Sequence, residues 1–265
     1  MNSPDDNTHS AAHEHNRRAW DARVRGGKTF ARAIDDEQFE EALSDVDLRG
    51  RKLLCLAAGG GRQSVIYAAS GAELTVVDIS GAMLQLDREA ARERGLNIRT
   101  IEASMDHLPM LRDSEFDIVV QPVSSCYIPN LQPMYAEVAR ITQPGGLYIS
   151  QHKQPTSLQA AVKPGADGYV LEEPYYREGP LPPVAGSRHR EEGTLEYLHR
   201  WEELIGQMCR AGFGIEDLFE PPHADDAARA GTFAHRSKFV APYVRIRARR
   251  VVRGEAAQRV WVPKE

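Results

Sequence analysis

Short apolar runs and helical apolar patterns alternate along most of this chain. Between the runs, apolar residues recur at helical spacing, as in 80–95 and 134–141. Strands that alternate with helices predict a parallel sheet, so the pattern favours an α/β fold. Seven runs have the length and composition of buried or half-buried strands: residues 53–56, 72–78, 96–102, 116–121, 147–152, 213–219 and 239–251.

Glycine and proline mark the ends of these elements. Gly59–Gly61 follows the first run as a turn that lets backbone approach another group closely. Ser80 is suited to cap the helix that Gly95 ends. Pro144–Gly146 stops a later helix directly before the run at 147–152. The order strand, glycine turn, helix therefore begins the predicted sheet.

The second half of the chain departs from this alternation. Residues 153–192 hold six prolines and four glycines with little periodicity, which predicts an insertion that serves as a substrate cap. Thr194–His199 alternates and is predicted to be a strand returning toward the site, followed by a helix from Trp201 to Gly212. The run at 239–251 alternates apolar residues with arginine, as expected for an antiparallel edge strand with one solvated face.

Composition narrows the class of protein. With 265 residues, 42% hydrophobic and 27% charged, the chain resembles an ordinary globular protein. No apolar run approaches the roughly 18 residues that cross a membrane, and the polar N-terminus is no secretory signal. Three widely spaced cysteines favour a reducing compartment, so we expect a cytoplasmic protein with no membrane partner. The cysteines and histidines show no metal-binding spacing, and the oligomeric state stays open.

The net charge of −5 argues against a nucleic acid partner, because nucleic acid binding needs a positive face. One basic run is the exception, and its simplest interpretation is a solvated strand face, with nucleic acid binding as the alternative. This run consists of Arg245, Arg247, Arg249, Arg250 and Arg253.

The glycine turn and the next strand carry candidate chemistry. Asp78 ends an apolar strand directly before a helix cap, where an open α/β sheet binds the two hydroxyls of a ribose. A side chain at Gly59 or Gly61 would block close approach of a ligand. These residues predict an adenosine-containing cofactor. Their spacing also approximates the dinucleotide fingerprint, so an NAD(P)-dependent oxidoreductase remains an alternative.

Four segments together resemble class I S-adenosylmethionine-dependent methyltransferases of the small-molecule type. Leu53–Gly61 resembles the family's first motif, with Cys55 in place of the usual acid and alanines before the glycines. Ala103–Pro109 resembles its adenine loop, with Ser104 in place of the usual aspartate. A helix, Pro144–Gly146 and a strand follow in the family's order, and an N-terminal Asn-Arg-x-x-Trp pattern ends at Trp20.

The resemblance implies a Rossmann-like sheet of seven mostly parallel strands, with an antiparallel last strand and a small cap insertion. We expect a disordered start at 1–10, lid helices and the cofactor core at 11–152, the cap at 153–199, completion of the core at 200–253 and a tail at 254–265. One lid helix is expected from His13 and the other over Asp36–Ser44. The cofactor implied is S-adenosylmethionine, held by Trp20, Ala57, Gly59, Gly61, Asp78, Ile79, Met83, Ser104, Met105, Asp106 and Gln121.

The acceptor is predicted to be a small molecule, because the cofactor occupies one half of the sheet edge and the tyrosine-containing cap emerges over the other. His199, His152 and Tyr127 are the candidates for catalysis or acceptor contact. Methyl transfer from a sulfonium needs alignment more than acid-base groups. A cofactor-binding regulatory protein without catalysis is a further alternative, since the first motif and the adenine loop are altered.

Overall fold

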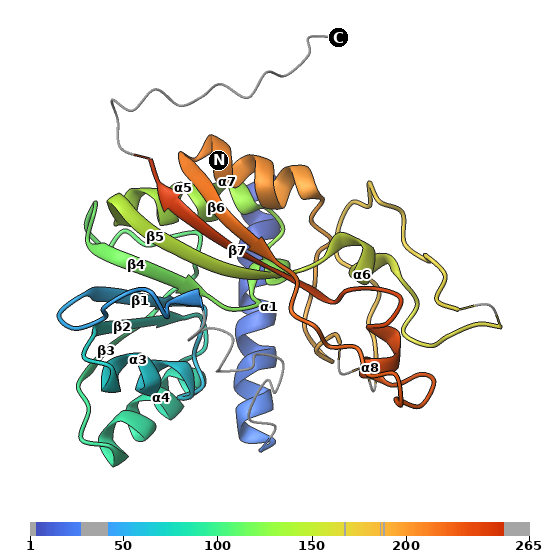
Figure 1. Ribbon diagram of the computed structural model, residues 1–265, viewed down its shortest axis with the longest axis horizontal. Helices are drawn as coiled ribbons and strands as arrows, with labels where there is room; N and C mark the ends of the chain where they lie inside the picture. Colours follow the sequence, from blue (N-terminus) through green and yellow to red (C-terminus); the bar gives the residue numbers. More distant parts are fainter. Residues whose placement is uncertain (1–3, 28–41, 167, 186, 188, 252–265) are drawn as a thin grey trace, which may run out of the picture.

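A twisted seven-stranded sheet forms the centre of the computed structural model, which describes residues 4–27, 42–166, 168–185, 187 and 189–251 (Figure 1). The strand order is β3-β2-β1-β4-β5-β7-β6. β7 runs in the direction opposite to the other six strands, and all pairs that do not include β7 are parallel. This confirms the predicted fold class. The strands are β1 Lys52–Leu56, β2 Glu73–Asp78, β3 Ile98–Glu102, β4 Phe116–Gln121, β5 Thr142–Lys153, β6 Phe213–Phe219 and β7 Tyr243–Arg250.

Helices cover both faces of the sheet, and the central strands are therefore apolar on both sides. In β1, Leu54 and Leu56 pack with α5 and α7, whereas Leu53 and Cys55 pack with α3 and α4. This explains the continuous apolar run at 53–56. The helical elements are α1 Pro4–Arg25, α3 Gln63–Ala69, α4 Gly81–Glu93, η1 Ser125–Tyr127, α5 Leu131–Ile141, α6 Pro155–Gln159, the π-helical turn η2 Glu202–Gly206, α7 Gln207–Arg210 and α8 Phe233–Arg236.

The prediction that 239–251 is an edge strand is wrong. β7 lies between β5 and β6, and β3 and β6 are the edges. The arginines of β7 interact with other parts of the protein. Arg245 is buried, with 4% of its surface exposed, and Arg247 forms ion pairs with Asp45 and Glu216. The alternation thus reflects a row of paired guanidinium groups on a sheet face. Arg253 lies outside the described residues.

The Pro144–Gly146 segment interrupts pairing inside β5. Phe116 pairs with Thr142, but Ile118 already pairs with Leu147, so the intervening residues of β5 bulge out of the ladder. A Cβ on Gly146 would lie 2.9 Å from the carbonyl oxygen of Asp117. The expected break is present, although β5 begins five residues before the expected start at Leu147.

The N-terminus also differs from expectation. Residues 4–10, predicted to be disordered, form the beginning of α1, which continues to Arg25. The long helix needs little hydrophobicity of its own because it packs along α4 and η1. Most of the second lid helix expected at 36–44 lies outside the described residues.

The cap is built from two segments that are distant in sequence, seen as the right-hand lobe in Figure 1. Residues 154–200 contain α6, and the connection between β6 and β7 contains α8. Arg236 of α8 joins them: it is 3% exposed and its guanidinium donates to the carbonyls of Ser157, Ala160 and Ala161 and to the hydroxyl of Ser157. Sequence reasoning missed this second segment.

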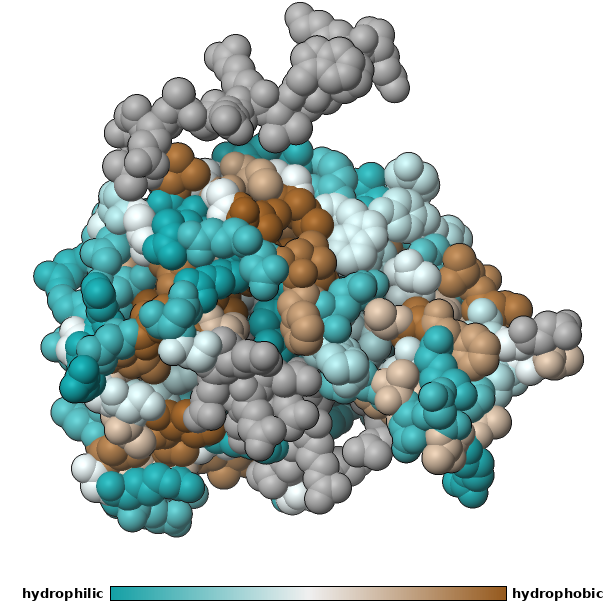
Figure 2. All heavy atoms as spheres, in the orientation of Figure 1, coloured by the Kyte–Doolittle hydropathy of each residue, from teal (hydrophilic) through white to brown (hydrophobic). Residues whose placement is uncertain are grey.

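Residues 194–199 do not form the predicted strand. Their hydrogen bonds go to separate partners: the Tyr197 N–H donates to the Cys126 carbonyl, and the Glu196 carbonyl accepts from Leu181. A strand needs a neighbouring strand to pair with, which alternation alone cannot supply. In Figure 2 hydrophobic colour reaches the surface of the cap lobe, where Val170 and Leu171 are exposed.

Replacing Arg236 by methionine is expected to lower the free energy of unfolding by about 3 kcal/mol, because four buried acceptors lose their donor. Urea denaturation of the full chain measures the change. Arg49→Met is the control, because Arg49 forms an exposed pair with Asp47 and its loss should leave the midpoint unchanged. Equal midpoints for both variants would contradict the role given to Arg236.

Candidate functional site

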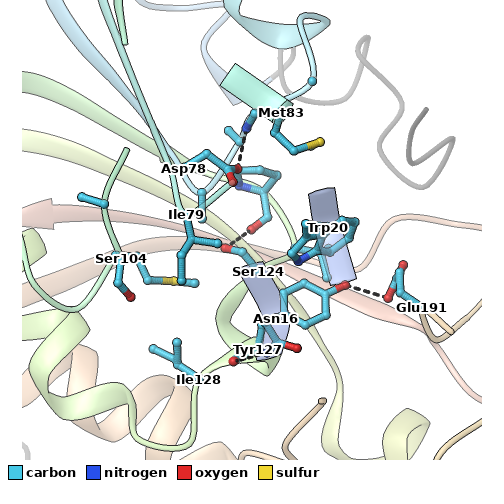
Figure 3. Close-up of a pocket in the computed structure, with 18 of the residues that line it drawn as sticks. Asn16, Trp20, Asp78, Ile79, Met83, Ser104, Ser124, Tyr127, Ile128 and Glu191 are labelled. Atoms are coloured by element: carbon cyan, nitrogen blue, oxygen red, sulfur yellow. Dashed lines mark hydrogen bonds between the residues drawn. The ribbon is translucent and has the colours of Figure 1, made fainter. Parts of the chain in front are cut away.

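A cavity lies at the carboxyl ends of β1, β2 and β4 and under α1 (Figure 3). This is where open α/β sheets bind ligands. Nine predicted site residues line it: Trp20, Ala57, Gly59, Asp78, Ile79, Met83, Ser104, Met105 and Tyr127. Five predicted residues are outside its lining: Gly61, Asp106, Gln121, His152 and His199.

The turn after β1 has positive φ angles, which residues with a side chain rarely adopt. Gly60 and Gly61 have φ values of 133° and 76°, and even Ala57 has a φ of 49°. A Cβ on Gly61 would lie 2.6 Å from the Leu86 carbonyl oxygen of α4. Glycine is required there because the turn rests on α4, and the expectation that a side chain at Gly61 would meet the ligand is corrected.

Asp78 ends β2 beside this turn and is 7% exposed. Its carboxylate accepts from the backbone N–H of Gly59 and of Ser80, both at 2.9 Å. Burial raises the pKa of Asp78 to about 6, against the effect of these two hydrogen bonds. A carboxylate has about four lone-pair positions, so two remain for the hydroxyls of a ribose.

A second buried carboxylate holds the turn from the other side. Asp87 of α4 is fully buried and accepts from the N–H of Gly60 at 2.8 Å and of Gly61 at 2.9 Å. The Ser64 hydroxyl donates to the same carboxylate at 2.5 Å. Burial raises the pKa of Asp87 above its ordinary value. Sequence reasoning missed Asp87, because it sits on a helix that the apolar pattern alone explains.

The loop after β3, which is predicted to contact adenine, forms one side of the cavity. Ser104 and Met105 line it together with Ile79. Asp106 lies behind them: its carboxylate accepts from the Ser104 hydroxyl at 2.5 Å and lies 3.0 Å from His13 of α1. Burial opposes ionisation of Asp106, but hydrogen bonds from His13 and Ser104 hold its pKa below the ordinary value.

Gln121 supports this loop from below. It is fully buried, its amide donates to the Ser124 hydroxyl at 2.9 Å, and its oxygen accepts from the Tyr148 hydroxyl. Its amide also contacts the sulfur of Met105 at 3.3 Å. Gln121 therefore does not line the cavity itself, but it orients Ser124 and Met105, which do.

α1 closes the cavity and is fixed at both ends of it. The Asn16 side chain is 2% exposed, donates to the carbonyls of Tyr127 and Leu195, and accepts from the Leu195 N–H. Five residues further along α1, Asp21 accepts from the hydroxyl of Ser80 at 2.6 Å. Trp20 packs edge-on against Tyr127, with ring centroids 5.2 Å apart. Asn16 begins the Asn-Arg-x-x-Trp pattern seen in the sequence, but of that pattern only Trp20 was assigned to the site.

Charged residues from the cap surround Tyr127. Its hydroxyl donates to Glu191 at 2.7 Å, and Lys153 at the end of β5 lies 2.6 Å from the same carboxylate oxygen. Lys153 also pairs with Glu196, which pairs with Arg190. Burial opposes ionisation of Glu191, but the charge of Lys153 holds its pKa below the ordinary value. Glu191 lines the cavity and was missed because it lies in a segment without periodicity.

His152 and His199 belong to the packing beneath the cavity. His152 is fully buried, with its two ring nitrogens 2.8 Å from the hydroxyls of Ser125 and Ser150. His199 Nε2 lies 2.9 Å from the Ile128 carbonyl oxygen. Burial lowers the pKa of His152 to about 3 and also lowers that of His199. The expectation that they line the acceptor pocket is corrected, and Tyr127 alone of the three candidates faces the cavity.

The described residues contain no cluster of three or more candidate metal ligands and no helix long and apolar enough to span a bilayer.

Several known proteins with similar sequences are named methyltransferases. A family model described as "Methyltransferase domain" matches residues 54–150. The chain is 31% identical over 227 residues to the uncharacterized methyltransferase YbaJ of Bacillus subtilis. The aligned region covers 78% of this chain and 89% of the relative.

Solved structures share the fold. An S-adenosylmethionine dependent methyltransferase from Mesorhizobium loti has a TM-score of 0.65 at 21% identity, covering 82% of this chain and 98% of the other. Geranyl diphosphate C-methyltransferase from Streptomyces coelicolor, solved with Mg²⁺, geranyl diphosphate and S-adenosyl-L-homocysteine, has a TM-score of 0.63 at 15% identity, covering 91% and 98%.

The family match and the relative from Bacillus subtilis favour a methyltransferase over the NAD(P)-dependent alternative. The chain belongs to the class I S-adenosylmethionine-dependent methyltransferases.

Proposed function

We propose that this enzyme transfers a methyl group to a small-molecule acceptor bound against Trp20, Tyr127 and Glu191. The observation that carries the proposal is the position of Tyr127 and Glu191, which line the same cavity as Asp78 but come from η1 and the cap. One cavity thus has a ribose-binding carboxylate on one side and a separate aromatic and acidic wall on the other (Figure 3).

The order of the strands supports this division. β3, β2, β1 and β4 lie side by side, so their carboxyl ends form one row. The adenine loop follows β3, Asp78 ends β2, the glycine turn follows β1, and η1 with Tyr127 follows β4. A cofactor with adenine at the β3 end of the row and ribose at Asp78 points its sulfur toward β4.

When bound, S-adenosylmethionine supplies a methyl group on an electrophilic sulfonium, so the chain itself has to align the acceptor and exclude water. α1 covers the cavity, and the Asn16 hydrogen bonds hold that cover against η1 and the cap. Glu191, kept ionised by Lys153, accepts a hydrogen bond from a hydroxyl or amino group of the acceptor and orients it.

The lining of the cavity favours a small acceptor. The wall combines the rings of Trp20, Tyr127 and Tyr243 with a single carboxylate, as expected for an aromatic or amphipathic metabolite. The structurally similar enzyme from Streptomyces coelicolor was solved with geranyl diphosphate, an amphipathic small molecule. This likeness supports the acceptor class without identifying the acceptor.

Affinity for S-adenosylhomocysteine is expected to fall at acidic pH. The carboxylate of Asp78, with a pKa of about 6 before ligand binding, gains a proton as the pH falls through this value and loses the charge that the ribose hydroxyls bond. For one linked proton, affinity at about pH 5 should be about tenfold weaker than at about pH 7.5. Calorimetric titration at both pH values measures the ratio.

Asp78→Ala is the matched variant for that titration. It should weaken binding at neutral pH by about 1.5 kcal/mol or more and flatten the pH dependence. A variant that binds as tightly as the wild type, or that keeps the tenfold change, would show that Asp78 does not hold the ribose.

Glu191→Gln tests the acceptor wall. With an acceptor identified by transfer of labelled methyl groups to fractionated metabolites, kcat/KM for that acceptor should fall about tenfold, because the ionised hydrogen-bond acceptor is lost. Affinity for S-adenosylhomocysteine should stay within about threefold, under about 1 kcal/mol. Glu172→Gln changes an exposed carboxylate of the cap and should leave both quantities unaltered. Unchanged turnover in Glu191→Gln would refute this placement of the acceptor.

A further inference from the structure

The backbone donors of the glycine turn are all in use. Gly59 N–H donates to Asp78, and the N–H groups of Gly60 and Gly61 donate to Asp87. A negatively charged group that arrives at the turn therefore finds two carboxylates behind it and no backbone donor left among these three glycines. Any donor for such a group has to come from a side chain.

Gln63 supplies an unused donor at this point. It is the first residue of α3, directly after the turn, it is 7% exposed, and it lines the cavity. Its Nε2 is buried and has no hydrogen-bond partner among the residues that the structure describes. A buried amide without a hydrogen-bond partner lowers the stability of the folded protein. Such a group in a binding cavity therefore indicates that a ligand supplies the partner.

The row of strand ends places Gln63 relative to the cofactor. Asp78 at the end of β2 marks the ribose, and β1 with its turn is the next strand in the row. With its ribose at Asp78, S-adenosylmethionine would direct its amino-acid part along that row toward the turn. Its ammonium group only donates hydrogen bonds, so its carboxylate is the partner that an amide N–H requires.

We propose that the side-chain amide of Gln63 binds the carboxylate of the amino-acid part of S-adenosylmethionine. Arg62, the neighbouring lining residue, adds a positive charge on the same side of the cavity. The inference rests on the bound cofactor being S-adenosylmethionine. Gln63 then favours binding of ligands that retain the carboxylate over ligands that lack it.

The test compares three ligands by calorimetry on the full-length wild type and on Gln63→Met, which keeps the length of the side chain and removes the amide. The ligands are S-adenosylhomocysteine, its decarboxylated analogue and 5′-methylthioadenosine, which lacks the whole amino-acid part. Gln63→Met should weaken S-adenosylhomocysteine binding about tenfold or more, as expected for a hydrogen bond to a charged group. Binding of the other two ligands should change less than about twofold.

Two further variants complete the comparison. Gln63→Glu places a negative charge opposite the carboxylate and should weaken S-adenosylhomocysteine more than Gln63→Met, again sparing the decarboxylated analogue. Gln85→Met changes an exposed glutamine of α4 and should leave all three affinities at the wild-type values.

The outcomes separate this inference from the proposed function. An equal loss of affinity for all three ligands in Gln63→Met, or no loss of affinity for any of them, would overturn the proposed role of Gln63. A wild type that binds 5′-methylthioadenosine but does not discriminate between S-adenosylhomocysteine and its decarboxylated analogue would overturn it as well. A wild type that binds none of the three would instead count against the cofactor site itself.

Discussion

Two buried carboxylates, Asp78 and Asp87, hold the glycine turn on which the cofactor site depends. Three consecutive backbone N–H groups at the end of β1 need acceptors, and these two side chains from β2 and α4 provide them. Burying two carboxylates so close together costs free energy, as the raised pKa values of both show. The hydrogen bonds offset this cost and keep the turn open beneath the ligand.

Buried charges are likewise paired on the proposed acceptor side of the cavity. Lys153 enters the protein interior at the end of β5 and is neutralised by Glu191 and Glu196 of the cap. An ion pair buried in this way specifies how the cap sits on the sheet, because breaking it would leave an unpaired charge. One oxygen of Glu191 accepts from both Lys153 and Tyr127, so the carboxylate is oriented before any acceptor arrives.

The repeating parts of the molecule were predictable from sequence, and the single contacts between distant segments were not. Apolar runs and the Gly59–Gly61 turn predicted β1 and its neighbours because each strand is buried on both faces. Nothing local in the sequence indicated that β7 lies inside the sheet, since that depends on where β6 pairs. His152 lies near the end of β5 as expected, yet its two ring nitrogens lie at hydrogen-bond distance from the hydroxyls of Ser125 and Ser150 beneath the cavity. Glu191 lies where no periodicity exists, so only the fold brings it to Tyr127.

The most direct test of this account is a crystal structure of the chain with S-adenosylhomocysteine bound. The account predicts that both ribose hydroxyls bond the Asp78 carboxylate, that adenine lies against Ser104 and Met105, and that the sulfur faces Tyr127 and Glu191. A ribose bound away from Asp78, or a sulfur that points away from Tyr127, would contradict the proposed division of the cavity into a cofactor side and an acceptor side.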